Sequence, residues 1–267
     1  MRVALGIEYN GEAFCGWQTQ PQVPTVQTTL EAALSRFAVS PISTICAGRT
    51  DTGVHATHQI VDFAPPVDRP LTAWVRGVNT FLPPTIAVKW ARWVPDDFSS
   101  RFSATERIYE YWILNAPIRS PLMEGKVGWQ FRPLDEKLMQ TAADYLIGEH
   151  DFSSFRAAEC QAKSPVRVMH EVRIERVGRM IGIRLRANAF LHHMVRNIVG
   201  SLVYVGTGRE SVDWFKEVLE ACDRTIAAPT FAAGGLYLVG VRYPKEYEIP
   251  LYSPTIWDYP VGIMDKF

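Results

Sequence analysis

The residues with the clearest chemical potential form one short run, AGRTDTGVHA, at positions 47–56. Two glycines flank Arg49 and Asp51, and glycine permits tight turns and close approach of a ligand to the backbone. An arginine two residues from a carboxylate can keep that carboxylate ionised. Asp51 would then be in the protonation state that a nucleophile requires. The run therefore predicts nucleophilic chemistry at Asp51.

Two other interpretations of this run stay open. Asp, Thr and Gly are common turn formers, so Asp51 could be an ordinary turn residue. Asp51-Thr52-Gly53 is also the catalytic triplet of aspartic proteases, in which two such carboxylates share one proton. The chain has one such triplet, so a protease would have to be a homodimer. The approach to Asp51 through Ala-Gly-Arg-Thr also differs from the apolar strand that protease triplets follow.

Histidines and cysteines give little support for a metal or redox site. His55 and His58 are spaced for a metal, and His192 and His193 could complete such a site. Neither a third ligand nor a helical context supports zinc. The four cysteines lie far apart and form no C-x-x-C pair. We therefore expect no metal.

Composition indicates a globular protein with an uneven charge distribution. The chain has 267 residues, of which 47% are hydrophobic and 21% charged, enough for a sizeable core. No apolar run is long enough to span a membrane and no signal peptide is evident, so a cytoplasmic protein is expected. The net charge is zero, but residues 156–196 contain nine Lys or Arg against three acids. This segment favours nucleic-acid binding, although any one of its arginines could simply solvate a strand.

Hydrophobic periodicity predicts the elements that position the 47–56 run. In the first half we expect strands at 2–9, 43–47, 59–63 and 85–93, and helices at 25–38 and 71–81. In the second half we expect strands at 108–114, 171–177, 181–187 and 236–241, and helices at 133–146, 190–205 and 212–222. Short connections and an excess of strands indicate an α+β protein with a mixed or antiparallel sheet.

The run AGRTDTGVHA resembles the signature loop of the TruA family of pseudouridine synthases. Other stretches resemble the same family in the same order: ALGIEYNG and GWQ (4–11 and 16–18), RFSATERIYEY (101–111), DFSSFRA (151–157), NAFLHHMVRNIVGS (188–201) and GLYLVGV (235–241). These stretches span nearly the whole chain. Thr52 stands where the family usually has alanine, a change that is conservative in size.

The resemblance implies a role for each of five residues. Asp51 matches the catalytic aspartate, and Arg49 matches the arginine that positions the RNA or the flipped nucleotide. Tyr109 matches the tyrosine stacked near the target base, and Arg196 an arginine that pairs with the catalytic aspartate. Leu236 resembles the apolar residue that floors the uracil pocket. Instead of metal ligands, His192 and His193 are expected to be a core histidine and one that contacts RNA or forms a hydrogen bond.

The resemblance further implies an architecture. Two similar subdomains, at 1–104 and 105–245, would form one extended, mixed and largely antiparallel sheet with helices on its face and a basic cleft. A tail would follow at 246–267, without an assigned role. The implied assembly is a homodimer that binds one tRNA across both subunits.

The implied activity is the conversion of uridine to pseudouridine at positions 38–40 of the tRNA anticodon arm, with Asp51 as nucleophile. This reaction breaks the glycosidic bond, turns the base and joins its C5 to the ribose, so no group is added or lost and no cofactor is expected. A non-catalytic tRNA-binding protein remains an alternative.

Overall fold

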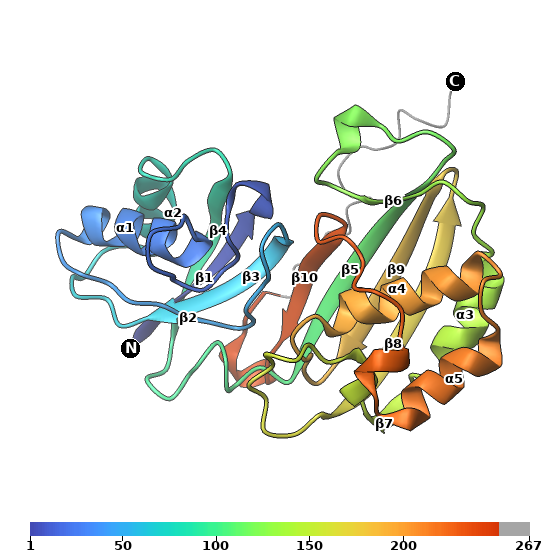
Figure 1. Ribbon diagram of the computed structural model, residues 1–267. Helices are drawn as coiled ribbons and strands as arrows, with labels where there is room; N and C mark the ends of the chain where they lie inside the picture. Colours follow the sequence, from blue (N-terminus) through green and yellow to red (C-terminus); the bar gives the residue numbers. More distant parts are fainter. Residues whose placement is uncertain (251–267) are drawn as a thin grey trace. The chain divides into compact units, whose positions relative to one another are not determined.

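The computed structural model describes residues 1–250, which divide into two compact units (Figure 1). The first unit contains Met1–Arg107 and residues 237–250, and the second contains Ile108–Leu236. Within residues 1–250, no helix is long and apolar enough to cross a membrane. Most of the tail predicted at 246–267 lies outside the described residues.

The first unit is built around a sheet with the strand order β4-β1-β3-β10, in which β2 pairs with β3. Its strands are β1 (Arg2–Tyr9), β2 (Ile45–Cys46), β3 (His55–Phe63), β4 (Ile86–Val94) and β10 (Leu236–Arg242), and its helices are α1 (Val26–Ala38) and α2 (Leu71–Asn79). β1 runs antiparallel to both β3 and β4, β2 runs antiparallel to β3, and β10 runs parallel to β3.

Aromatic packing joins the two helices to this sheet. The ring of Trp74 on α2 lies 5.1 Å from Phe37 on α1 and 5.1 Å from Phe63 on β3, both in edge-to-face geometry. Such aromatic contacts add to the free energy gained by burial. Thr25 caps the start of α1, where its hydroxyl accepts a hydrogen bond from the backbone N–H of Thr28.

β3 is buried along its whole length. It begins at His55, four residues before the predicted strand, because its backbone pairs with β1 on one side and β10 on the other, at Tyr9↔Ala56 and Tyr237↔His55. A strand buried on both faces lacks the alternation of apolar and polar residues on which a sequence prediction depends. The start of β3 was therefore missed.

The second unit carries a sheet with the order β5-β9-β8-β7, to which β6 adds parallel to β5. Its strands are β5 (Glu106–Asn115), β6 (Gly128–Gln130), β7 (Gly148–Asp151), β8 (Val166–Val177) and β9 (Met180–Ala187), and its helices are α3 (Glu136–Asp144), α4 (Met194–Gly206) and α5 (Val212–Ala221). β8 runs antiparallel to β7 and β9. α3 packs against α4, α5 and β8. The predicted α+β class with mixed, largely antiparallel pairing is confirmed.

α4 begins at Met194, four residues later than predicted. His193 precedes it with a φ of 61°, a left-handed conformation that interrupts the helical path. The apolar stripe predicted for this segment is buried: Leu191, Met194, Val195, Ile198 and Leu202. The periodicity was therefore interpreted correctly, and the boundary was set by the backbone of one residue.

Most arginines of the predicted basic segment are engaged inside the second unit. Four of them form ion pairs: Arg173 with Glu175, Arg176 with Glu136, Arg184 with Glu110 and Arg186 with Glu171. Arg156 and Arg167 donate to backbone carbonyls. The formal charge excess of residues 156–196 therefore overstates the positive charge that this segment presents to solvent.

Candidate functional site

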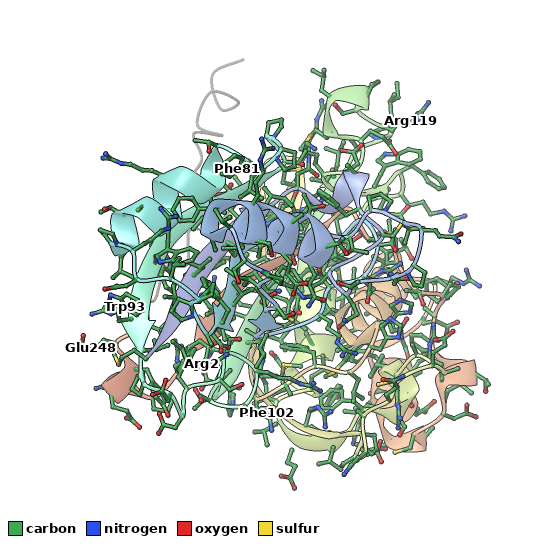
Figure 2. All side chains as sticks on the ribbon, turned by 90° about the vertical axis from the view of Figure 1, so that its left-hand side faces the viewer. Arg2, Phe81, Trp93, Phe102, Arg119 and Glu248 are labelled. Atoms are coloured by element: carbon green, nitrogen blue, oxygen red, sulfur yellow. The ribbon has the colours of Figure 1, made fainter. Side chains whose placement is uncertain are left out.

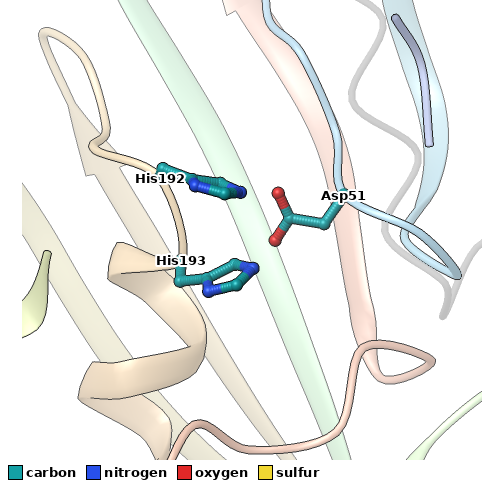
Figure 3. Close-up of side chains that lie close together, drawn as sticks. All are labelled: Asp51, His192 and His193. Carbon is teal, nitrogen blue, oxygen red and sulfur yellow. The ribbon is translucent and has the colours of Figure 1, made fainter. Parts of the chain in front are cut away.

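Asp51 lies on the loop that connects β2 to β3, and its side chain is half-buried (Figure 3). Its backbone carbonyl accepts a hydrogen bond from the N–H of Val54 at 3.1 Å, which closes a four-residue turn. Gly53 occupies the third position of this turn with a φ of 77°. Such a position favours glycine because a Cβ would be strained there. The turn orients Asp51 and explains the glycine that follows it by two residues.

The chain before α1 holds the loop at Thr50. The hydroxyls of Tyr9 and Thr50 share a hydrogen bond of 2.8 Å, and the backbone N–H of Trp17 donates to the carbonyl of Thr50 at 3.0 Å. Gly16 packs so closely that a Cβ there would lie 2.8 Å from the same carbonyl. Both Tyr9 and Trp17 are buried, so the residue before Asp51 is fixed through its side chain and its backbone.

Gln59 and Arg107 hold the beginning of the loop. The buried amide of Gln59 donates to the carbonyl of Gly48 at 2.6 Å and accepts from its N–H at 3.3 Å. Arg107 donates to the carbonyl of Ala47 through Nε and a terminal nitrogen at 3.2 and 3.0 Å. Gln59 was not among the predicted site residues. The available signal was an amide side chain inside the otherwise strand-forming stretch that leaves the loop.

His55 and His58 have structural surroundings that account for their presence. Nδ1 of His55 accepts a hydrogen bond from the N–H of Gly11 at 3.0 Å, and its ring stacks on Tyr237 at 4.7 Å. Burial lowers the pKa of His58 to about 4, and the carbonyl of Pro250 acts in the opposite direction. The pairing of β1 with β3 has a register shift between Ala56 and Gln59, so the two histidines do not follow simple strand alternation. Each of them is accounted for by its own contacts within the first unit.

Cys46, at the end of β2, is half-buried. Burial raises the pKa of its thiol to about 12, while the nearby charges of Arg49 and Arg101 act in the opposite direction. A thiol with so high a pKa is a poor nucleophile at neutral pH. Asp51 is therefore the better candidate nucleophile of this neighbourhood. The side chain of Arg49 is exposed.

In the second unit, Tyr109 lies on β5 and is buried, with its ring edge-to-face against Phe190 at 5.0 Å. His192 and His193 project from consecutive positions ahead of α4, with ring centroids 4.1 Å apart (Figure 3). His192 is exposed and His193 is half-buried. The expectation that one of them is a core histidine was wrong, because the left-handed backbone at His193 precedes the buried face of α4.

Arg196 lies in the first turn of α4 and is half-buried. Its Nε donates to the carbonyl of Phe231 at 2.9 Å, and its own carbonyl accepts from the N–H of Phe231 at 3.2 Å. Leu236, the first residue of β10, is buried. The first unit thus carries Arg49 and Asp51, and the second unit carries the other three predicted site residues.

Comparisons with known proteins find relatives over most of this chain. The family described as tRNA pseudouridine synthase matches residues 6–103 and 142–244. A tRNA pseudouridine synthase A from Burkholderia multivorans is 56% identical over 250 residues, which cover 94% of this chain and 93% of that protein. A protein of the same name from a Janthinobacterium species is 54% identical over 255 residues, covering 93% of this chain and 94% of that protein.

Similarity to solved structures is weaker. The crystal structure of a Cbf5-Nop10-Gar1 complex aligns with a TM-score of 0.41 at 10% identity, covering 98% of this chain and 56% of that chain. That likeness is too low to support an argument about function. The family match and the relatives over nearly the full length are sufficient on their own, and this chain belongs to the tRNA pseudouridine synthase family.

Proposed function

We propose that this protein converts uridine to pseudouridine at positions 38–40 of the tRNA anticodon arm, with Asp51 as the nucleophile. The observation that carries the proposal is the half-buried Asp51 on a loop whose backbone is held at Ala47, Gly48 and Thr50. Family membership supports the reaction class, and it removes the reason to interpret the Asp-Thr-Gly triplet as a protease motif.

The reaction requires few groups. The bond between N1 of uracil and C1′ of the ribose breaks, a bond between C5 and C1′ forms, C5 loses its proton and N1 gains one. An ionised carboxylate can hold a covalent intermediate while the base turns, whether it attacks C1′ or C6. A loop that is fixed before substrate arrives keeps this carboxylate in place without a further ordering cost.

The remaining site residues have proposed supporting roles. The ring of Tyr109 offers a stacking face to a base taken out of its stack, and its hydroxyl is available to move a proton. The resemblance gives Arg196 the role of the arginine that pairs with the catalytic aspartate, and such pairing lowers the pKa of a carboxylate. Arg49 binds the RNA backbone, and Leu236 forms the apolar floor of the uracil pocket. These roles rest on the family resemblance and on the burial of Tyr109 and Leu236.

The proposed partners are tRNA and a second copy of the chain. Recognition of the anticodon arm by shape and backbone suits an enzyme that accepts several neighbouring uridines. We expect a cytoplasmic homodimer that binds one tRNA across both subunits, with an affinity that falls steeply as salt rises.

The decisive experiment compares wild type with Asp51→Asn on unmodified tRNA transcripts that carry uridine at positions 38–40. Pseudouridine formation and RNA binding are measured in parallel. We expect the variant to bind normally and to form no pseudouridine, because asparagine keeps the shape of aspartate but not its charge. Asp68→Asn is the matched control, since Asp68 is exposed and lies outside the loop.

Two outcomes would contradict the proposal. If wild type binds these transcripts but modifies none of them, the non-catalytic tRNA-binding alternative replaces it. If Asp51→Asn retains activity, another residue is the nucleophile.

A further inference from the structure

An exposed aromatic residue stands on the loop between β4 and β5 in the first unit. Phe102 is 79% exposed, although a phenylalanine normally buries its ring (Figure 2). The guanidinium of Arg101 lies over this ring, 5.2 Å from its centroid. An exposed ring beside a cation has the composition of a surface that binds RNA by stacking and charge.

The loop is held firmly below Phe102. The N–H and hydroxyl of Ser100 donate to the buried carboxylate of Asp62 at 2.7 and 2.6 Å. Ser99 and Ser103 exchange hydrogen bonds across the loop, at 3.1 Å to the hydroxyl of Ser103 and 2.9 Å to the carbonyl of Ser99. The ring is therefore exposed by a rigid loop rather than left there by fraying.

Arg107 links this loop to the loop of Asp51. One terminal nitrogen of its guanidinium donates to the carbonyls of Arg101 at 2.8 Å and Ala47 at 3.0 Å. Arg101 and Arg49 both lie close enough to Cys46, at the base of the Asp51 loop, to oppose the burial that raises the pKa of its thiol. The exposed side chains of Arg49 and Arg101 therefore belong to one surface, which continues to Phe102.

The positive charge of the surface formed by Arg49, Arg101 and Phe102 favours a negatively charged partner. Among residues 1–250, neither Arg49 nor Arg101 has a carboxylate within ion-pair distance, in contrast to the paired arginines of residues 156–196. Two exposed cations without such partners favour an anionic ligand.

We infer that Phe102 stacks on a base of the bound tRNA while Arg101 and Arg49 hold the adjacent phosphates. This surface lies beside the loop of Asp51 and deepens the proposed function, on which it rests for the identity of the RNA. Its role is to position the anticodon arm, because Phe102 has no part in the bond exchange.

The test measures the affinity of labelled, unmodified tRNA for wild type, Phe102→Ala and Phe102→Trp. We expect Phe102→Ala to weaken binding about tenfold and Phe102→Trp to stay within about twofold, because a stacked base contributes roughly that much. KM should rise with kcat unchanged. Arg101→Gln should lower the slope of log affinity against log salt by about 0.7 to 0.9.

Phe81→Ala is the matched control, because Phe81 in the same unit also lies under an arginine, Arg36, at 4.5 Å (Figure 2). It should bind tRNA like wild type. Melting temperatures should not change for Phe102→Ala, since the ring is exposed, so a loss of affinity would not reflect unfolding.

Unchanged tRNA affinity in Phe102→Ala would overturn the inference. So would a variant with normal tRNA affinity but weaker self-association in analytical ultracentrifugation, which would assign the surface to a second copy. If wild type isomerises no transcript and Phe102→Ala still weakens binding, the proposed function fails while the RNA surface stands.

Discussion

Asp51 and Tyr109 are held in different ways. The side chain of Asp51 is half-buried, and its position is ordered by hydrogen bonds to its neighbours, at the hydroxyl of Thr50 and the backbone carbonyl of Gly48. Tyr109 is placed by its own ring, which is buried against Phe190. A substitution at Tyr109 can therefore remove the hydroxyl while the ring keeps its place. No substitution at Asp51 removes the charge while preserving the position as cleanly.

Removing the hydroxyl of Tyr109 tests its proposed part in proton transfer. We expect Tyr109→Phe to lower kcat about 10²-fold or more while tRNA affinity stays the same, because general acid–base groups contribute in that range. Single-turnover pseudouridine formation and RNA binding provide the two readouts. An unchanged kcat would restrict Tyr109 to stacking.

Tyr111→Phe is the control for this change. Tyr111 lies two residues further along the same strand, where its hydroxyl donates to the carbonyl of Ala232 at 2.7 Å. Its loss should lower the free energy of unfolding by about 1 kcal/mol and leave kcat unaltered.

At the scale of elements, the Asp51 loop depends on glycines outside it. Gly16 has a φ of 84° and faces the carbonyl of Thr50, while Gly11 lies against the carbonyl of Val54. These contacts bring the chain ahead of α1 onto the loop more closely than any side chain would permit. The shape of the site is therefore set by two segments of backbone in direct contact.

Gly16→Ala should move the loop. Its Cβ would lie 2.8 Å from the carbonyl of Thr50, in a conformation that already strains an alanine. We expect about 2 to 3 kcal/mol lower unfolding free energy and a kcat reduced at least tenfold, because small displacements of reacting groups are costly. Urea unfolding and single-turnover kinetics provide the measurements.

Gly208→Ala is the control that introduces backbone strain without a close contact to the new Cβ. Gly208 has a φ of 70°, but nothing lies within 4 Å of a Cβ there. It should lose about 1 kcal/mol of stability and no activity. Equal effects of the two substitutions on kcat would show that contact with Thr50 is unimportant.

The paired arginines of β8 and β9 should affect stability rather than RNA binding. Arg184 bonds to the buried carboxylate of Glu110 at 2.6 Å. Removing one partner of a buried pair typically costs about 3 to 5 kcal/mol, so Arg184→Gln should be strongly destabilising. Arg173→Gln should change unfolding free energy by less than about 1 kcal/mol, since both partners of that pair are largely exposed. A reduced salt slope of tRNA binding in folded Arg184→Gln would contradict the structural role.

For the whole molecule, buried His58 should couple stability to pH. Burial lowers its pKa in the folded state to about 4, against about 6.5 in the unfolded chain. The unfolded state therefore binds more protons between these values. The contribution of neutral His58 is complete above about pH 6.5, and up to about 3 kcal/mol is lost as pH falls towards 4.

Urea unfolding of wild type and His58→Gln across this pH range tests the coupling. The variant should be less dependent on pH between 6.5 and 4, whereas His170→Gln, at an exposed position, should follow wild type. Parallel pH profiles for wild type and His58→Gln would contradict the assignment.

The sequence predicted much of the fold where an element depends on interactions between residues close together in the chain. α1 and the buried stripe of α4 were found because their apolar residues recur with the period of a helix. The strands β6 and β7 were missed because three or four residues carry too little pattern. The start of β3 was missed because burial on both faces removes the alternation that marks a strand.

The sequence by itself determined the family of this protein and its candidate nucleophile. Both depend on glycines, a charged pair and an ordered series of motifs, which are properties of neighbouring residues. Tertiary structure decided the rest. The bond from Tyr9 to Thr50 spans 41 positions, and that from Arg184 to Glu110 spans 74. Such contacts depend on strand register and helix packing, which bring distant residues together only in the folded chain. For that reason the structure alone distinguished the arginines that form ion pairs within the fold from the exposed Arg49 and Arg101, for which RNA binding is proposed.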